Sequence, residues 1–356
     1  MSHSEAAITH PVERNRGIGA TTTVLFLLLA ALAAACGGGD AAGDSGDAAA
    51  DPATAPEAEM LDAAGDVWII DGGNLGVRRI GLGEDGRLSR VALPSQPRQL
   101  AVTGDAAWIA VDDGRVGRVD AAGDSLTAMV TVGAGLSGIA ATDDAVWVTS
   151  DGGGAERPAQ VLRIDPAADS LVAAVPISGD EGRFVGLAAH AGAVWVLTGD
   201  GTLARIDPAR NRVAERTEVE TGDAQRRSRL AVGPGAVYVA SGSGQLHILD
   251  PQNLEERAQL SLGQDSVGAI VAGRDHVFVA FPAADRVLAR DPTTGATDHV
   301  IEVDEPRKLQ VVGGLLLVAG DDLLIFDGAT GERLRKVPTG RLGDFALAPE
   351  EAAPEP

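Results

Sequence analysis

Cysteine, lysine and aromatic residues are scarce in this sequence. The 356 residues include one cysteine, so no disulfide can form within the chain. Lys308 and Lys336 are the only lysines, and the formal net charge is −22. So acidic a chain lacks the basic surface that a general nucleic-acid-binding protein needs. We therefore expect no nucleic acid among its partners.

Helical patterning and long apolar runs are missing as well. Beyond the N-terminal region, no window shows apolar residues at the i, i+3, i+4 and i+7 spacing of a helix face. Residues 24–35 form an apolar run of twelve residues. Such a run is short for a transmembrane helix but suits the core of a signal peptide.

The apolar run leads directly into Cys36, within the sequence LAAAC at residues 32–36. This sequence resembles the lipobox of bacterial lipoproteins, although Ala33 stands where leucine is usual. In that family the peptide is cut before the cysteine, which then carries lipid. The resemblance implies a lipoprotein signal peptide over residues 1–35, and an exported protein anchored through Cys36 to a bacterial membrane, facing the periplasm or the cell exterior. A plain signal peptide with a chance cysteine is the alternative.

Two further segments have the composition of unfolded chain. Residues 36–58 are mainly Gly, Ala, Asp and Pro, and residues 351–356 are acidic and Pro-rich. Neither can bury enough apolar surface to fold. We predict that residues 36–58 form a flexible tether, that residues 59–350 form the folded domain, and that residues 351–356 form a disordered tail.

The domain repeats a unit of about 40 residues, most fully at residues 192–219 (GAVWVLTGDGTLARIDPARNRVAERTEV). This stretch reads as three short strands separated by a Gly-Asp-Gly turn and an Asp-Pro turn. Aligning the first strand of each copy gives the anchors Trp68, Trp108, Trp147, Trp195, Tyr238, Phe278 and Leu317, which are 39 to 48 residues apart. Such a period with several short strands predicts a β-propeller.

A further short apolar strand begins about eight residues before most anchors. The fold class is therefore all-β: a seven-bladed β-propeller with four-stranded antiparallel blades, whose strands we call A to D from the axis outward. The inner strands look almost purely apolar, and we expect the anchors to be wedged between blades.

Closing the ring needs an A strand for the first blade. We assign this strand to residues 344–348, with residues 60–63 as the rival.

An aspartate recurs at the turn between the C and D strands. Asp165, Asp207, Asp250 and Asp291 are each followed by proline. Because these residues lie on different blades, they cannot form one metal site. We expect each to cap its own turn through its side-chain oxygen.

The unit GAVWV-x₃-DGTLARIDPARNRV resembles the YVTN/NHL-type propeller repeats of bacterial extracytoplasmic proteins, over about residues 60–350. The shared residues build blades, so the resemblance implies the fold and says little about activity. Relatives with such blades include cell-surface binding modules, a lyase that uses His and Glu with a divalent metal, and a lactonase group that holds a metal with inner-strand Glu, Asn and Asp.

Catalytic motifs are not found in the sequence. His190, His247, His276 and His299 map to four blades, mostly away from the channel mouth, and Asp344 is the only acid beside the inner strands. No phosphate loop, zinc spacing or GxSxG motif occurs. We predict no metal, no cofactor and no catalytic residue. The favoured function is a non-catalytic interaction module, and the alternative is a lactonase-like hydrolase or lyase with an axial divalent metal.

In propellers the D–A and B–C loops share one face, around the mouth of the channel. The D–A loops carry the candidate ligand-binding residues Arg98, Arg183, Arg226, Arg227, Arg229, Arg307, Lys308 and Arg341. Three longer loops, at residues 151–159, 179–184 and 221–229, are predicted on the same face. Arginine suits carboxylate, phosphate or acidic partners, so we predict that this face binds an unknown protein, glycan or anionic ligand. The alternative is that nearby acids, among them Asp180, Glu181, Asp223, Asp304 and Glu305, pair with these residues.

Overall fold

The computed structural model divides the chain into two units, Met1–Asp51 and Pro52–Pro356. It describes residues 60–61, 64–71, 75–83, 86–142, 144–151, 158–177, 183–190, 192–222 and 228–347, all in the second unit. The predicted signal peptide, Cys36, the predicted tether and tail, and Arg226 and Arg227 lie outside the described residues. None of the helices in the described ranges has the length and hydropathy needed to cross a membrane.

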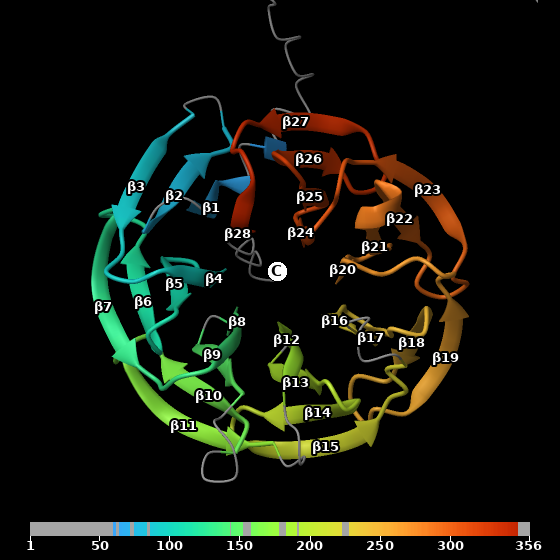
Figure 1. Cartoon of the computed structure of the whole chain (residues 1–356), viewed down its shortest axis with the longest axis horizontal. Helices are drawn as coiled ribbons and strands as arrows, with labels where there is room; N and C mark the ends of the chain where they lie inside the picture. Colours follow the sequence, from blue (N-terminus) through green and yellow to red (C-terminus); the bar gives the residue numbers. More distant parts are fainter. Residues whose placement is uncertain are drawn as a thin grey trace, which may run out of the picture. The chain divides into compact units, whose positions relative to one another are not determined.

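The described residues form seven four-stranded antiparallel sheets, arranged as blades around a central axis (Figure 1). The A strands of blades 1 to 7 are β28 (Leu342–Leu347), β4 (Pro97–Val102), β8 (Leu136–Thr142), β12 (Phe184–His190), β16 (Arg229–Val232), β20 (Ala269–Ala272) and β24 (Lys308–Val312). The B strands are β1 (Asp66–Asp71), β5 (Ala106–Val111), β9 (Ala145–Ser150), β13 (Ala193–Thr198), β17 (Val237–Ala240), β21 (Val277–Phe281) and β25 (Leu315–Ala319).

The C strands are β2 (Gly76–Gly81), β6 (Arg115–Asp120), β10 (Gln160–Asp165), β14 (Thr202–Asp207), β18 (Gln245–Leu249), β22 (Arg286–Arg290) and β26 (Leu323–Asp327). The D strands are β3 (Leu88–Ala92), β7 (Ser125–Thr131), β11 (Ser170–Pro176), β15 (Arg212–Glu218), β19 (Glu256–Ser261), β23 (Thr297–Glu302) and β27 (Arg333–Val337). A short 3₁₀ helix, η1 (Pro282–Ala284), follows β21. The predicted fold class is therefore confirmed, and every anchor lies on a B strand.

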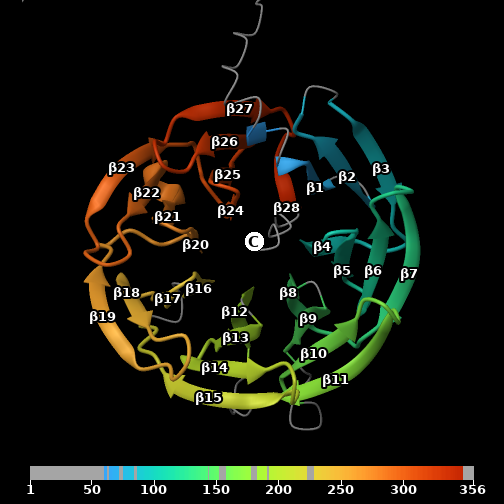
Figure 2. The ribbon, with the colours of Figure 1, turned by 180° about the vertical axis from the view of Figure 1, so that it is seen from behind.

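The C-terminal strand closes the ring. β28 pairs with β1 in antiparallel register, with Phe345 opposite Ile69, and the two strands lie side by side in both views (Figures 1 and 2). Met60 and Leu61, from the rival segment, have helical conformation. The assignment of the last strand to the first blade is thus confirmed.

The core consists of separate apolar clusters, each shared by two neighbouring blades. Trp147, for example, packs with Val161 of its own blade and with Val194 and Ile206 of blade 4. The Trp147 side chain is fully buried. A B strand with a neighbour on both faces must be apolar at every position, which explains the continuous apolar runs in the repeat. The predicted role of the anchors as wedges between blades is confirmed.

The C–D turns are capped as predicted. The Asp207 carboxylate accepts backbone N–H bonds from Ala209 at 2.9 Å and Arg210 at 3.2 Å. Asp250 and Asp291 accept the same pair of bonds in their own turns. These backbone N–H groups favour the ionised form, and they hold the pKa of Asp250 and of Asp291 below the usual range.

A recurrent arginine joins each of the first four blades to the next. Arg163 lies opposite Trp147 in the sheet, and its guanidinium carbon is 5.4 Å from the centre of the indole. Its Nη1 donates to Pro208 O at 2.8 Å and to Asn211 Oδ1 at 3.2 Å, both in the C–D turn of blade 4. Equivalent contacts join Arg79 to Ala121, Arg118 to Pro166 and Arg205 to Gln252.

We expect Arg163→Met to lower the free energy of unfolding by about 1–3 kcal/mol, because the variant leaves Pro208 O without its charged donor. Chemical denaturation measures this loss. The matched control is Arg210→Met, since Arg210 is an exposed partner of Asp207 within one turn. Equal effects of the two substitutions would show that the contact between blades contributes nothing of its own.

Candidate functional site

The D–A and B–C loops meet at one end of the propeller, as predicted. Asp112 N donates to Gln96 O at 3.0 Å, and Arg307 N donates to Ala319 O at 2.8 Å. Asp151 in a B–C loop accepts the backbone N–H of Phe184 at 2.9 Å. The ends of the inner strands are therefore held by neighbouring turns, and they surround the mouth of the axis.

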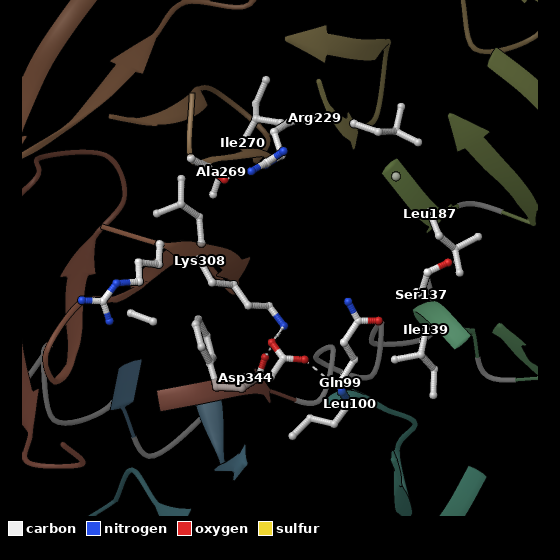
Figure 3. A pocket seen from close by; sticks show the side chains of 18 of the residues that line it. Gln99, Leu100, Ser137, Ile139, Leu187, Arg229, Ala269, Ile270, Lys308 and Asp344 are labelled. Carbon is white, nitrogen blue, oxygen red and sulfur yellow. Dashed lines mark hydrogen bonds and ion pairs between the residues drawn. The ribbon is translucent and has the colours of Figure 1, made fainter. Parts of the chain in front are cut away.

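A cavity of about 520 Å³ lies at this end of the propeller (Figure 3). Its wall comes from the first halves of the A strands and from the ends of B strands that lead into the B–C loops, such as Thr149 and Ala319. Its volume is typical of small-molecule sites in proteins. The cavity lies on the face that the sequence predicts for binding.

One position of the repeat contributes a side chain to this cavity from most blades. It directly precedes the aligned apolar residue of each A strand, and we call the set the inner layer. From blade 1 to blade 7 the inner layer is Asp344, Gln99, Gly138, Gly186, Arg229, Ala269 and Lys308. Four of these residues are polar, so the expectation of almost purely apolar inner strands is wrong at this position.

The glycines of the inner layer allow neighbouring A strands to approach closely. A Cβ on Gly186 would lie 2.5 Å from Cβ of Leu230 in blade 5, and one on Gly138 would lie 3.4 Å from Cβ of Leu187 in blade 4. Side chains at this position thus point toward the next blade. Where the residue is larger, the strands are bridged through its side chain instead.

Three inner-layer residues form such bridges. Arg229 Nε donates to Gly268 O of blade 6 at 2.6 Å. Lys308 Nζ pairs with the Asp344 carboxylate and donates to Phe345 O at 2.7 Å. The other carboxylate oxygen of Asp344 accepts the backbone N–H of Leu100 at 2.9 Å. Asp344 therefore links the closing strand β28 to both neighbouring blades.

Two further polar side chains that line the cavity are Gln99 of blade 2 and Ser137 of blade 3. Gln99 makes no side-chain hydrogen bond among the described residues, and its amide points into the open centre (Figure 3). Ser137 donates to Asp151 at 2.7 Å. Neither residue is among those predicted from the sequence, although the position of Gln99 in the aligned repeat identifies it.

The candidate basic residues fall into distinct groups. Arg98 lies 3.6 Å from Asp112, and Arg307 lies 2.5 Å from Glu305, so both have acidic partners. Arg183 and Arg341 are exposed, and neither side chain has a hydrogen bond or ion pair among the described residues. The cavity wall includes Arg229, Arg307 and Lys308. Arg98, Arg229 and Lys308 lie within A strands rather than in the D–A loops to which the sequence analysis assigned them.

The histidines lie away from the cavity. His247 is buried and contacts Glu256 at 3.1 Å, and His276 contacts Asp298 at 3.1 Å. Burial lowers the pKa of His299, and His276, whose ring centre is 5.3 Å away, lowers it further. Within the described ranges, no cluster of three or more His, Cys, Asp or Glu residues could hold a metal ion.

The fold and the cavity define the class: a seven-bladed β-propeller with an axial cavity at the D–A end. No protein-family model matches the chain, and no curated protein matches its sequence. Similar solved structures include the computationally designed Ika8 protein (TM-score 0.61, 15% identity, covering 77% of this chain and 84% of that one). Another is a functionally unknown protein from Desulfotomaculum acetoxidans (TM-score 0.64, 14% identity, covering 81% of this chain and 100% of that one).

BamB from Moraxella catarrhalis is a more distant neighbour, with a TM-score of 0.48 and 17% identity over 68% of this chain and 76% of that one. At these identities the designed protein and the Desulfotomaculum acetoxidans protein support the fold alone. Any statement of function has to come from the residues of the site.

Proposed function

We propose that this chain is a lipid-anchored extracytoplasmic propeller that acts as a non-catalytic binding module for an anionic partner at its cavity end. The observation that carries the proposal is the charge of the cavity wall. Its described residues include three cations, Arg229, Arg307 and Lys308, but one carboxylate, Asp344. In a chain with a net charge of −22, this local excess of positive charge favours a negatively charged ligand.

The position of Asp344 favours binding over catalysis. A catalytic base needs an oxygen atom that can reach the substrate. One oxygen of Asp344 is engaged by Lys308 and the other by the backbone of Leu100. The carboxylate thus holds strands together at the ring closure.

The lipid anchor is supported by the sequence that ends at Cys36, because an apolar run of signal-peptide length precedes it. Lipoproteins carry several acyl chains, and two or more chains give stable membrane attachment. The tether would then give the propeller reach from the membrane surface. Metabolic labelling with a palmitate analogue that persists in Cys36→Ala would contradict this anchoring.

A thermal-shift screen at low salt tests the binding proposal. The probes are glucuronate, inorganic phosphate and an acidic polysaccharide. A probe at one hundred times its dissociation constant should stabilise the fold by about 2.7 kcal/mol, which raises the melting temperature by a few degrees. The shift should shrink as salt is added. If none of these anions stabilises the protein, the proposed function is wrong.

A further inference from the structure

Gln99 offers the cavity a full set of unused hydrogen-bonding groups. It stands at the inner-layer position of blade 2, and its amide makes no hydrogen bond among the described residues while it points into the open centre (Figure 3). A primary amide has two N–H donors and a carbonyl acceptor in one plane. Gln99 can therefore hold a ligand group that both donates and accepts, as a hydroxyl group does.

The ammonium group of Lys308 lies on the other side of Asp344 in the ring. Its Nζ pairs with the Asp344 carboxylate, donates to Phe345 O at 2.7 Å and lies 5.3 Å from the centre of the Phe345 ring. An ammonium group has three N–H donors, so one donor remains after these two contacts among the described residues. Blades 7, 1 and 2 thus present a fixed N–H donor, a charge-balanced pair and an amide to the cavity.

Backbone N–H groups add donors across the ring, on blades 4 and 5. Leu100 N donates to Asp344 at 2.9 Å, so the N–H group at this position of an A strand points out of its own sheet. Leu187 and Leu230 line the cavity at the same position and in the same register. The direction of an N–H group follows the register. The residues that match Asp344 here are glycines, so no inner-layer side chain accepts these two N–H groups.

The wall of the cavity is about as polar as it is apolar, and its apolar part includes the aliphatic side chains of Ile139, Leu187 and Ile270. A sugar ring has the same mixture, because its edge carries hydroxyl groups and its faces carry C–H groups. An inorganic anion has no apolar face for the aliphatic side chains. A fatty acid has no hydroxyl groups, and it would leave the polar groups of the wall without partners, which costs affinity.

We infer that the cavity binds a sugar acid, whose hydroxyl groups are held by Gln99 and Lys308 and by the backbone N–H groups of Leu187 and Leu230. This inference rests on the proposed function and names its ligand class. The carboxylate of the sugar supplies the negative charge that the proposed function requires. The hydroxyl groups supply partners for donors and acceptors that the described residues leave unused.

Isothermal titration calorimetry of the purified protein with glucuronate, galacturonate and hexanoate tests the inference. All three probes carry one carboxylate, but hexanoate has no hydroxyl group. At least one of the two sugar acids should bind at least tenfold more tightly than hexanoate. If neither sugar acid exceeds hexanoate by that factor, the inference is overturned.

Variants of Gln99 test which side chain reads the hydroxyl groups. Gln99→Leu keeps the size of the side chain but removes its hydrogen-bonding atoms, so it should weaken the tighter sugar acid at least tenfold and leave hexanoate unchanged. Its melting temperature should equal that of the unmodified protein, because no hydrogen bond among the described residues is lost. The matched control is Gln160→Leu, at the start of β10 and outside the cavity lining, which should have no effect. Unchanged sugar-acid affinity in Gln99→Leu overturns the assignment.

The outcomes also separate this inference from the proposed function. If phosphate stabilises the protein but neither sugar acid binds more tightly than hexanoate, the anion-binding function stands and the sugar-acid inference is wrong. If no anion binds, both fail. A galacturonate trimer distinguishes two sources of the same chemistry: tighter binding than the monomer identifies a glycan end, equal binding identifies a free sugar acid, and either result supports the inference.

Discussion

A chain that ends at Arg341 should lose the cooperative unfolding transition of the intact protein. This truncation removes β28, and with it the fully buried Phe345 and Leu347 and the bridge through Asp344. Loss of a buried Phe or Leu side chain alone costs about 2–5 kcal/mol. Two such losses take most of the roughly 5–15 kcal/mol that stabilises a typical domain. The β1 edge is exposed as well.

Thermal unfolding followed by circular dichroism measures the effect. The matched control ends at Glu350 and keeps the whole strand, so it should melt like the intact chain. A synthetic peptide of residues 341–350 should restore the transition in the truncated chain, because the exposed β1 edge can accept an added strand. A truncated chain that melts at the temperature of the control would contradict the role of β28 in closing the ring.

The blades could be predicted from the sequence because their signals are local. An anchor such as Trp147 has apolar neighbours on both sides, since its strand is buried on both faces. An Asp-Pro turn such as Asp207-Pro208 closes with hydrogen bonds to residues two and three positions further on. Each of these features needs only a few consecutive residues. Their recurrence about every 40 residues was therefore enough to give the number of blades.

The cavity could be predicted only in part, because its contacts join distant parts of the chain. The residue pair Lys308 and Asp344 is separated by 36 positions, and the pair Leu100 and Asp344 by 244. No local pattern shows which polar residue of an inner strand meets which neighbour. The sequence did contain one usable signal, since Gln99 occupies the same repeat position as Asp344. The error of placing Arg229 in a loop arose at a strand boundary, where short-range patterns are least informative.

A double-mutant cycle on Lys308 and Asp344 should give the largest coupling of the ion pairs at this end of the propeller. The Asp344 side chain is 8% exposed, against 38% for Lys308. If its partner is removed, the Asp344 carboxylate therefore stays buried and unpaired, whereas the Lys308 ammonium group can be solvated. Lys308→Met should therefore cost more than Asp344→Asn. We expect about 3 kcal/mol for the lysine variant, the low end for buried pairs, because the ammonium group remains partly hydrated.

In Asp344→Asn, the amide still offers a carbonyl oxygen to Leu100, and Lys308 can turn toward solvent. The double variant should then be more stable than the sum of the two single effects predicts, by at least about 1 kcal/mol. The exposed pair Arg98 and Asp112 is the matched control, and its two substitutions should be nearly additive. Denaturant titrations of both sets at low and high salt measure the coupling. If Lys308 and Asp344 are also additive, their pair contributes no specific stability to the ring closure, and the closing strand is held by its apolar contacts and its pairing with β1.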